Sequence, residues 1–194
     1  PKDSTTIYPS ARILLLDIHG EYSDALADIS TVFRINPNKG QKTLHIPYWA
    51  VDPTDLITFL TGGIADEKAL HIYDKITELK QTSLRNGSFL GVDKKSLTLD
   101  TPIPYSLKQL WLDLIDAELR TLEGVNRDQP AKVSDGDANN LIPPKYKPHA
   151  MGSAGPFINT AAPGIKRQLI NLRSRLLDKQ YDFLLHPGDW EPQL

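Results

Sequence analysis

The sequence predicts an α/β fold with few strands. A short, continuous apolar run at residues 13–16 is typical of a parallel strand covered on both faces. Two further short segments rich in β-branched and apolar residues follow it, and from residue 52 onward apolar residues recur at spacings of three and four. Because three short strands make only a thin sheet, we expect a partial sheet followed by helices.

Composition bounds the class of protein. The 194 residues suffice for one domain or for one domain with a large insertion. A net charge of -2 excludes a globally basic nucleic-acid binder and leaves room for a local basic patch. Cysteine is absent, the five histidines lack metal-ligand spacing, and no apolar run approaches the ~20 residues of a transmembrane helix. We therefore expect no metal site, no membrane partner and a cytoplasmic location.

The predicted strands come first. The first covers Ala11 to Leu16 and ends in Asp17-Ile18-His19-Gly20, the position at which α/β proteins place ligand chemistry. The second covers Thr31 to Ile35, residues 36–40 form a turn, and the third strand covers Thr43 to Ile46.

Helix signals follow. Asp52 followed by Pro53 predicts a helix start, and the glycine pair 62–63 predicts its end. Asp66 is expected to cap a second helix that stops near residues 86–87. Ser106 and Gln109 form a capping-box pattern that opens a third helix, whose apolar stripe is Leu107, Leu110, Trp111, Leu114, Ile115, Leu119 and Leu122.

The C-terminal part mixes a loop, a helix and a strand. Residues 125–162 show little periodicity and predict a long loop, a kind of segment that is often functional. A helix begins after Pro163 with Ile165, Leu169, Leu172 and Leu176 on one side. Tyr181 to Leu185 predicts a short final strand.

The segment Asp17 to Tyr22 carries the candidate chemistry. It combines two carboxylates, Asp17 and Glu21, with the imidazole of His19 and the turn-forming Gly20. Such a set could hold Mg²⁺-bound water or orient a water during phosphoryl transfer. Alternatively, the two acids cap the following helix and the glycine makes the turn.

This segment resembles the D-x-H-G-E-Y signature of the HerA family of DNA translocases, relatives of the FtsK motors. The resemblance continues at residues 44–50, 55–60 and, more weakly, 181–187. It implies a partial RecA-like P-loop ATPase core at 1–64, a mainly helical insertion at 65–160 and a return to the core at 161–194. The chain lacks a G-x-x-x-x-G-K-[ST] motif and a Walker B strand. We therefore expect an internal segment that does not hydrolyse ATP by itself.

The resemblance also implies roles and partners for the parent protein. Asp17 and Glu21 would be catalytic, His19 and Gly20 would shape the nucleotide site, and ATP with Mg²⁺ would be the cofactors. The parent would be a homo-hexamer that moves along double-stranded DNA. It would act beside a NurA-type nuclease or a sirtuin-like effector, in DNA end processing or antiphage defence.

Two alternatives stay open. The chain could instead be a non-catalytic helical module for protein interaction, in which the D-x-H-G-E-Y segment is structural. The last helix is basic, and its cations could face DNA phosphates or a neighbour's nucleotide, or could simply form a solvated helix face. These cations are Lys166, Arg167, Arg173, Arg175 and Lys179.

Overall fold

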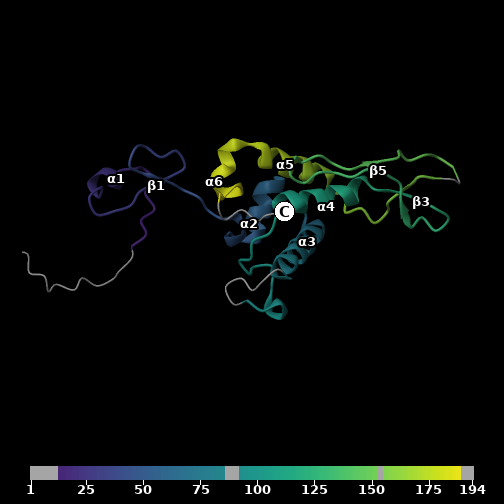
Figure 1. Cartoon of the computed structure of the whole chain (residues 1–194), viewed down its shortest axis with the longest axis horizontal. Helices are drawn as coiled ribbons and strands as arrows, with labels where there is room; N and C mark the ends of the chain where they lie inside the picture. The colour runs from purple at the N-terminus through teal and green to yellow at the C-terminus, as the bar shows by residue number, and fades with distance from the viewer. Residues whose placement is uncertain (1–12, 86–91, 153–154, 189–194) are drawn as a thin grey trace, which may run out of the picture. The chain divides into compact units, whose positions relative to one another are not determined.

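The computed structural model describes residues 13–85, 92–152 and 155–188 and shows a mixed α/β protein. The chain divides into two compact units, Pro1–Leu44 and His45–Leu194 (Figure 1). The first unit contains α1 (Tyr22–Ala25), β1 (Phe33–Arg34) and β2 (Lys42–Thr43). The second contains the helices η1 (Tyr48–Ala50), α2 (Pro53–Thr61), α3 (Asp66–Arg85), η2 (Lys94–Ser96), α4 (Leu107–Leu119), α5 (Lys166–Leu177), η3 (Lys179–Tyr181) and α6 (Asp182–Leu185). Its strands are β3 (Thr121–Glu123), β4 (Gln129–Pro130), β5 (Lys132–Ser134), β6 (Lys145–Tyr146) and β7 (Phe157–Ile158).

In the first unit, β1 and β2 pair in parallel. The turn between them is the predicted one: the Gln41 N–H donates to the Asn38 carbonyl oxygen at 3.0 Å, and Gly40 has a φ of +90°, which favours glycine. The second and third predicted strands therefore exist in shortened form, as β1 and β2. β2 begins one residue earlier than the predicted third strand.

The predicted first strand is wrong over its described residues. Ile13, Leu14 and Leu16 are 90%, 89% and 83% exposed, and residues 13–16 have no strand assignment. Ala11 and the residue after it lie outside the described residues. A strand needs the hydrogen bonds of a neighbouring strand, and no strand in the described part of the chain pairs with this run.

In the second unit, local capping signals place the helices as predicted. The Asp52 carboxylate accepts from the Thr54 N–H at 2.9 Å at the start of α2, which ends at Gly62 with a φ of +73°. The Ser106 hydroxyl accepts from the Gln109 N–H at 3.1 Å at the start of α4. α3 begins at Asp66 itself, and the predicted cap at residues 86–87 lies outside the described residues.

The helices of the second unit share one core. α4 packs against α3 on one side and α5 on the other, and α5 also packs against α2 (Figure 1). The predicted apolar stripe of α5 is fully buried, with Ile165, Leu169 and Leu172 at 0% exposure. Each such buried aliphatic side chain stabilises the fold by about 1.5–3 kcal/mol relative to exposure. No helix in the described part of the chain is long and apolar enough to cross a membrane.

The predicted long loop at 125–162 is right only in part, because short antiparallel strands interrupt it. β3 pairs with β4 on one side and with β7 on the other, and β5 pairs with β6. These strands are two or three residues long and mostly exposed, too short to show a period-2 pattern in the sequence. α4 accordingly ends at Leu119, and Leu122 belongs to β3.

The predicted final strand is also wrong. The segment forms the short helices η3 and α6, because the Asp178 carboxylate accepts from the Gln180 N–H at 3.1 Å and starts a helical turn. The segment still makes a backbone hydrogen bond to the end of the predicted third strand, since the Ile46 N–H donates to the Phe183 carbonyl oxygen at 2.7 Å.

Candidate functional site

The Asp17 carboxylate organises the D-x-H-G-E-Y turn. Its Oδ1 accepts from the Gly20 N–H at 2.8 Å and the Glu21 N–H at 3.2 Å, and its Oδ2 accepts from the Tyr22 N–H at 3.0 Å. The donors are the N–H groups that precede and open α1, which otherwise have no intrahelical partner. Asp17 therefore accepts the first N–H groups of this short helix, as the capping interpretation predicts for it, whereas Glu21, the second acid of that interpretation, makes no side-chain cap hydrogen bond.

Gly20 occupies a position that glycine suits for two reasons. Its φ is +75°, a conformation that side chains rarely adopt. A Cβ atom there would lie 3.0 Å from an Nη atom of Arg34 in β1. The predicted role of Gly20 in shaping the turn agrees with this geometry. Sequence reasoning missed Arg34, because its approach to the turn depends on how β1 packs and leaves no local pattern.

The capping hydrogen bonds also set the charge of Asp17. Burial acts to raise the pKa of Asp17, but hydrogen bonds from the backbone N–H groups of Tyr22, Gly20 and Glu21 outweigh it and hold the pKa below its usual value. The carboxylate is therefore anionic at neutral pH. Two oxygens offer about four lone-pair sites, and the backbone N–H groups of Gly20, Glu21, Tyr22 and Ser23 are all directed at them.

The other predicted site residues are exposed. His19 and Glu21 both face solvent, and the Glu21 side chain makes no capping hydrogen bond to α1. Among residues 13–85, 92–152 and 155–188, no cluster of three or more His, Asp or Glu side chains could hold a metal ion. The structure thus brings the backbone of residues 20–22 to Asp17, and it leaves His19 and Glu21 accessible beside it.

A second cluster of charged groups joins α4 to the short strands. The Asp116 Oδ1 accepts from the Tyr146 hydroxyl at 2.6 Å and lies 3.3 Å from the Lys132 Nζ, while its Oδ2 pairs with Arg120. Burial acts to raise the pKa of Asp116, and the hydrogen bonds from Arg120, Tyr146 and Lys132 hold it below its ordinary value. Because Asp116 binds groups at the end of α4 and on β5 and β6 together, this cluster links α4 to the short strands.

The basic residues of the last helix divide into two kinds. The Arg173 Nε donates to the Leu141 carbonyl oxygen at 3.0 Å. The Arg175 guanidinium lies 5.0 Å from the ring centroids of both Phe59 and Tyr181, a cation–π arrangement that holds α2, α5 and η3 together. The other three, Lys166, Arg167 and Lys179, are exposed, and so is Arg173 despite its hydrogen bond.

The comparison with known families concerns nearly the whole chain. A family model described as the central domain of helicase HerA matches residues 4–193, so it covers both structural units. No curated protein matches the chain. Because the match spans far more than half of the sequence and includes the Asp17 turn, the chain belongs to the family of HerA helicase central domains.

Proposed function

We propose that this chain is a segment of a HerA-type ATPase that assembles as a homo-hexamer and moves along double-stranded DNA, and that the chain alone does not hydrolyse ATP. The family match over residues 4–193 carries the proposal. In the parent, residues 1–64 and 161–194 would belong to a RecA-like core that uses ATP and Mg²⁺, and residues 65–160 would form an insertion. We also propose a cytoplasmic location for the parent.

We assign catalytic roles to Asp17 and Glu21. We assign contact with the nucleotide to His19 and Gly20. The anionic Asp17, and the exposed Glu21 next to it, support a role in holding Mg²⁺-bound water or orienting the attacking water. The backbone hydrogen bonds to Asp17 also make it structurally useful, so the test must separate charge from shape.

The decisive experiment compares Asp17→Asn with Asp17→Ala in the full-length parent. The asparagine keeps one acceptor oxygen, for the Gly20 and Glu21 N–H groups, and loses the charge together with the acceptor of the Tyr22 N–H, whereas the alanine loses both oxygens. If the carboxylate is catalytic, Asp17→Asn lowers DNA-stimulated ATP hydrolysis by about 10²–10⁴-fold while ATP binding and assembly persist. Glu21→Gln tests the second acid, and Asp28→Ala, an exposed acid nearby, is the matched control.

Activity near the wild-type level in Asp17→Asn, with loss only in Asp17→Ala, would assign the residue a structural role. An inactive wild-type parent would overturn the ATPase proposal as a whole. Measuring the 194-residue chain in parallel checks the expectation that it is inactive alone.

One observation favours the interaction-module alternative. Residues 45–194 form a compact unit with its own core, in which α3 and α4 lie beside α2 and α5. A NurA-type nuclease or a sirtuin-like effector would then bind the surface of this unit. Deleting residues 65–160 would expose that core, so surface substitutions on α3 and the short strands are the better test. Partner binding that survives all of them would remove this assignment.

A further inference from the structure

The side of α5 that faces away from the core is basic. The apolar stripe of the helix lies in the core, whereas Lys166, Arg167 and Arg173 are exposed. α5 contains no acidic residue. None of the ion pairs among the described residues includes one of these three cations. The exposed side of α5 therefore carries positive charge that ion pairing does not neutralise in that part of the chain.

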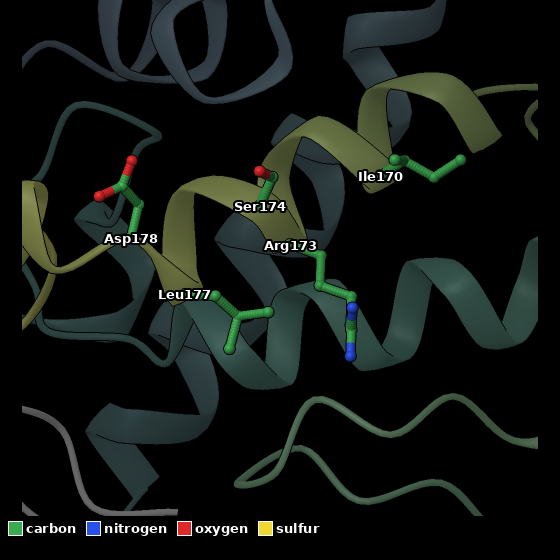
Figure 2. A pocket seen from close by; sticks show the side chains of 5 residues that line it. All are labelled: Ile170, Arg173, Ser174, Leu177 and Asp178. Atoms are coloured by element: carbon green, nitrogen blue, oxygen red, sulfur yellow. The ribbon is translucent and has the colours of Figure 1, made fainter.

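Two apolar side chains lie within this basic side. Ile170 and Leu177 are 63% and 57% exposed and lie about two helical turns apart. Together with Arg173 and Ser174, which lie between them, they border an open hollow that Figure 2 shows along one side of α5. Because exposed aliphatic surface gains free energy when a partner covers it, this hollow is suited to an apolar side chain.

The hollow has the spacing of a hole in helix packing. Its four lining residues on α5 are Ile170, Arg173, Ser174 and Leu177, at positions i, i+3, i+4 and i+7. In a coiled coil, four residues of one helix form the hole that receives one side chain of the facing helix, and these positions are the ones that surround such a hole. A second helix packed along α5 would therefore place one side chain in this hollow.

The charges around the hollow define the chemistry of this second helix. Arg173 forms part of the wall, and Lys166 and Arg167 lie one turn before the hollow. The acid in the lining, Asp178, already accepts hydrogen bonds from Gln180. Carboxylates on either side of the inserted side chain would oppose the three cations, and such charge pairs steer association and set the register of two helices.

We propose that the exposed side of α5 binds an acidic amphipathic helix of another protein, which inserts one leucine-sized side chain into the hollow and places carboxylates opposite Lys166, Arg167 and Arg173. A DNA backbone would also meet the cations, but it would leave Ile170 and Leu177 in water. The charge and the spacing of α5 carry the proposal, which holds whether or not the parent protein hydrolyses ATP.

A designed peptide tests this contact with the full 194-residue chain. The acidic peptide has roughly 20 residues, with leucine at the a and d positions of each heptad and glutamate at e and g, so that charge repulsion keeps it from pairing with itself. A matched basic peptide carries lysine in place of each glutamate. NMR chemical shifts of the backbone amides locate the binding site, and fluorescence anisotropy of labelled peptide gives the Kd. We expect shifts centred on α5, a Kd of about 100 µM or tighter for the acidic peptide, and about tenfold or more weaker binding of the basic one.

Variants on the surface of α5 separate the apolar contribution from the charge. Ile170→Gln with Leu177→Gln removes the apolar walls and keeps good helix formers. Lys166→Glu with Arg167→Glu reverses the charge at the start of α5, where acids suit the helix dipole. Each pair should weaken binding of the acidic peptide by about tenfold or more, and the charge reversal should strengthen binding of the basic peptide. Leu70→Gln, at a leucine of α3 that is 59% exposed, is the matched control and should leave the Kd unchanged.

Four results would overturn the proposal. Shifts centred outside α5, or no shifts at about 1 mM peptide, exclude the site. Equal Kd values for the acidic and basic peptides exclude recognition by charge. A wild-type chain that associates with itself through α5 in the absence of peptide would assign the surface to a second copy. Duplex DNA that binds more tightly than the acidic peptide, and whose binding is lost with the same charge reversal, would assign the surface to nucleic acid.

Discussion

The indole Nε1 of Trp111 on α4 donates a hydrogen bond to the backbone carbonyl oxygen of Leu169 on α5, at 3.1 Å. Both side chains are buried, at 2% and 0% exposure. This bond sets the position of the Trp111 ring against α5, because a buried indole needs an acceptor for its N–H group. The two helices therefore depend on a specific contact as well as on apolar burial.

Trp111→Phe should destabilise the second unit by about 2–4 kcal/mol. The substitution removes the donor and leaves unfilled volume where the larger ring of the indole lay. Urea unfolding followed by circular dichroism measures the change in the free energy of unfolding. Leu177→Ala, on the exposed side of α5, is the control and should shift it by about 0.5 kcal/mol or less. Equal effects of the two substitutions would contradict the role given to the Trp111 bond.

Lys80 should make the stability of the second unit depend on pH. Its Nζ donates to the carbonyl oxygens of Leu99 and Thr101, the latter at 2.8 Å. Burial lowers the pKa of Lys80 from 10.5 to about 8, against the opposing charge of Asp100. Between these values the unfolded chain binds more protons than the folded one. The free energy of unfolding should therefore rise with pH through this window.

The measurement is the difference in unfolding free energy between the wild type and Lys80→Met, taken from pH 7 to pH 9.5. The variant removes the titrating group and orphans the carbonyl oxygens of Leu99 and Thr101. The difference should grow in favour of the wild type as pH rises, since a neutral amine still has two N–H donors for these two acceptors. A difference that stays constant with pH would show that Lys80 keeps an ordinary pKa.

The helices could be predicted from sequence because their signals are local. Asp52 and Ser106 accept the N–H groups that their positions imply, and the apolar stripe from Ile165 to Leu176 is buried as its spacing predicts. The prediction failed for the first strand and for the strands after residue 125 for the opposite reason, since a strand exists only with a partner. The apolar run at 13–16 has no described partner, and the polar region after residue 125 pairs without any alternating pattern.

The candidate site was predictable in part. The carboxylate, glycine and turn of the segment from Asp17 to Tyr22 are local features, and the structure shows Asp17 and Gly20 in the geometry that such a turn requires. The approach of Arg34 and the exposure of Glu21 depend on packing between distant segments, which no spacing rule encodes. Whether Asp17 also acts on a nucleotide stays a prediction.

Asp17 should titrate below the usual aspartate value of 3.8. Its lowered pKa means that the turn gains stability above the unfolded-state pKa and loses it as pH falls through the folded-state value. Carboxyl chemical shifts followed by NMR against pH give the pKa directly. In Asp17→Ala the amide protons of Gly20 and Tyr22 should exchange faster with solvent, because their acceptor is gone. Unchanged exchange would mean that the turn does not depend on Asp17.

The Asp116 cluster should control how firmly the short strands are held to α4. Asp116→Ala removes the acceptor shared by Tyr146, Lys132 and Arg120, and it leaves a partly buried phenol and cations without their partner. Asp116→Asn keeps an acceptor for the Tyr146 hydroxyl, so it should cost less than Asp116→Ala, which we expect to cost about 1–3 kcal/mol.

Hydrogen exchange separates this effect from general destabilisation. The amide of Ala131, which donates to the Thr121 carbonyl oxygen, and that of Lys147, which donates to the Ala131 carbonyl oxygen, report on the strands. Both should lose protection in Asp116→Ala, whereas the amides of α5 should keep theirs, because the α5 core does not include the cluster. Equal loss in the strands and in α5 would show that Asp116 supports the whole unit. Loss confined to the strands would show that Asp116 holds the short strands to α4 and that the strands can open while the helices stay folded.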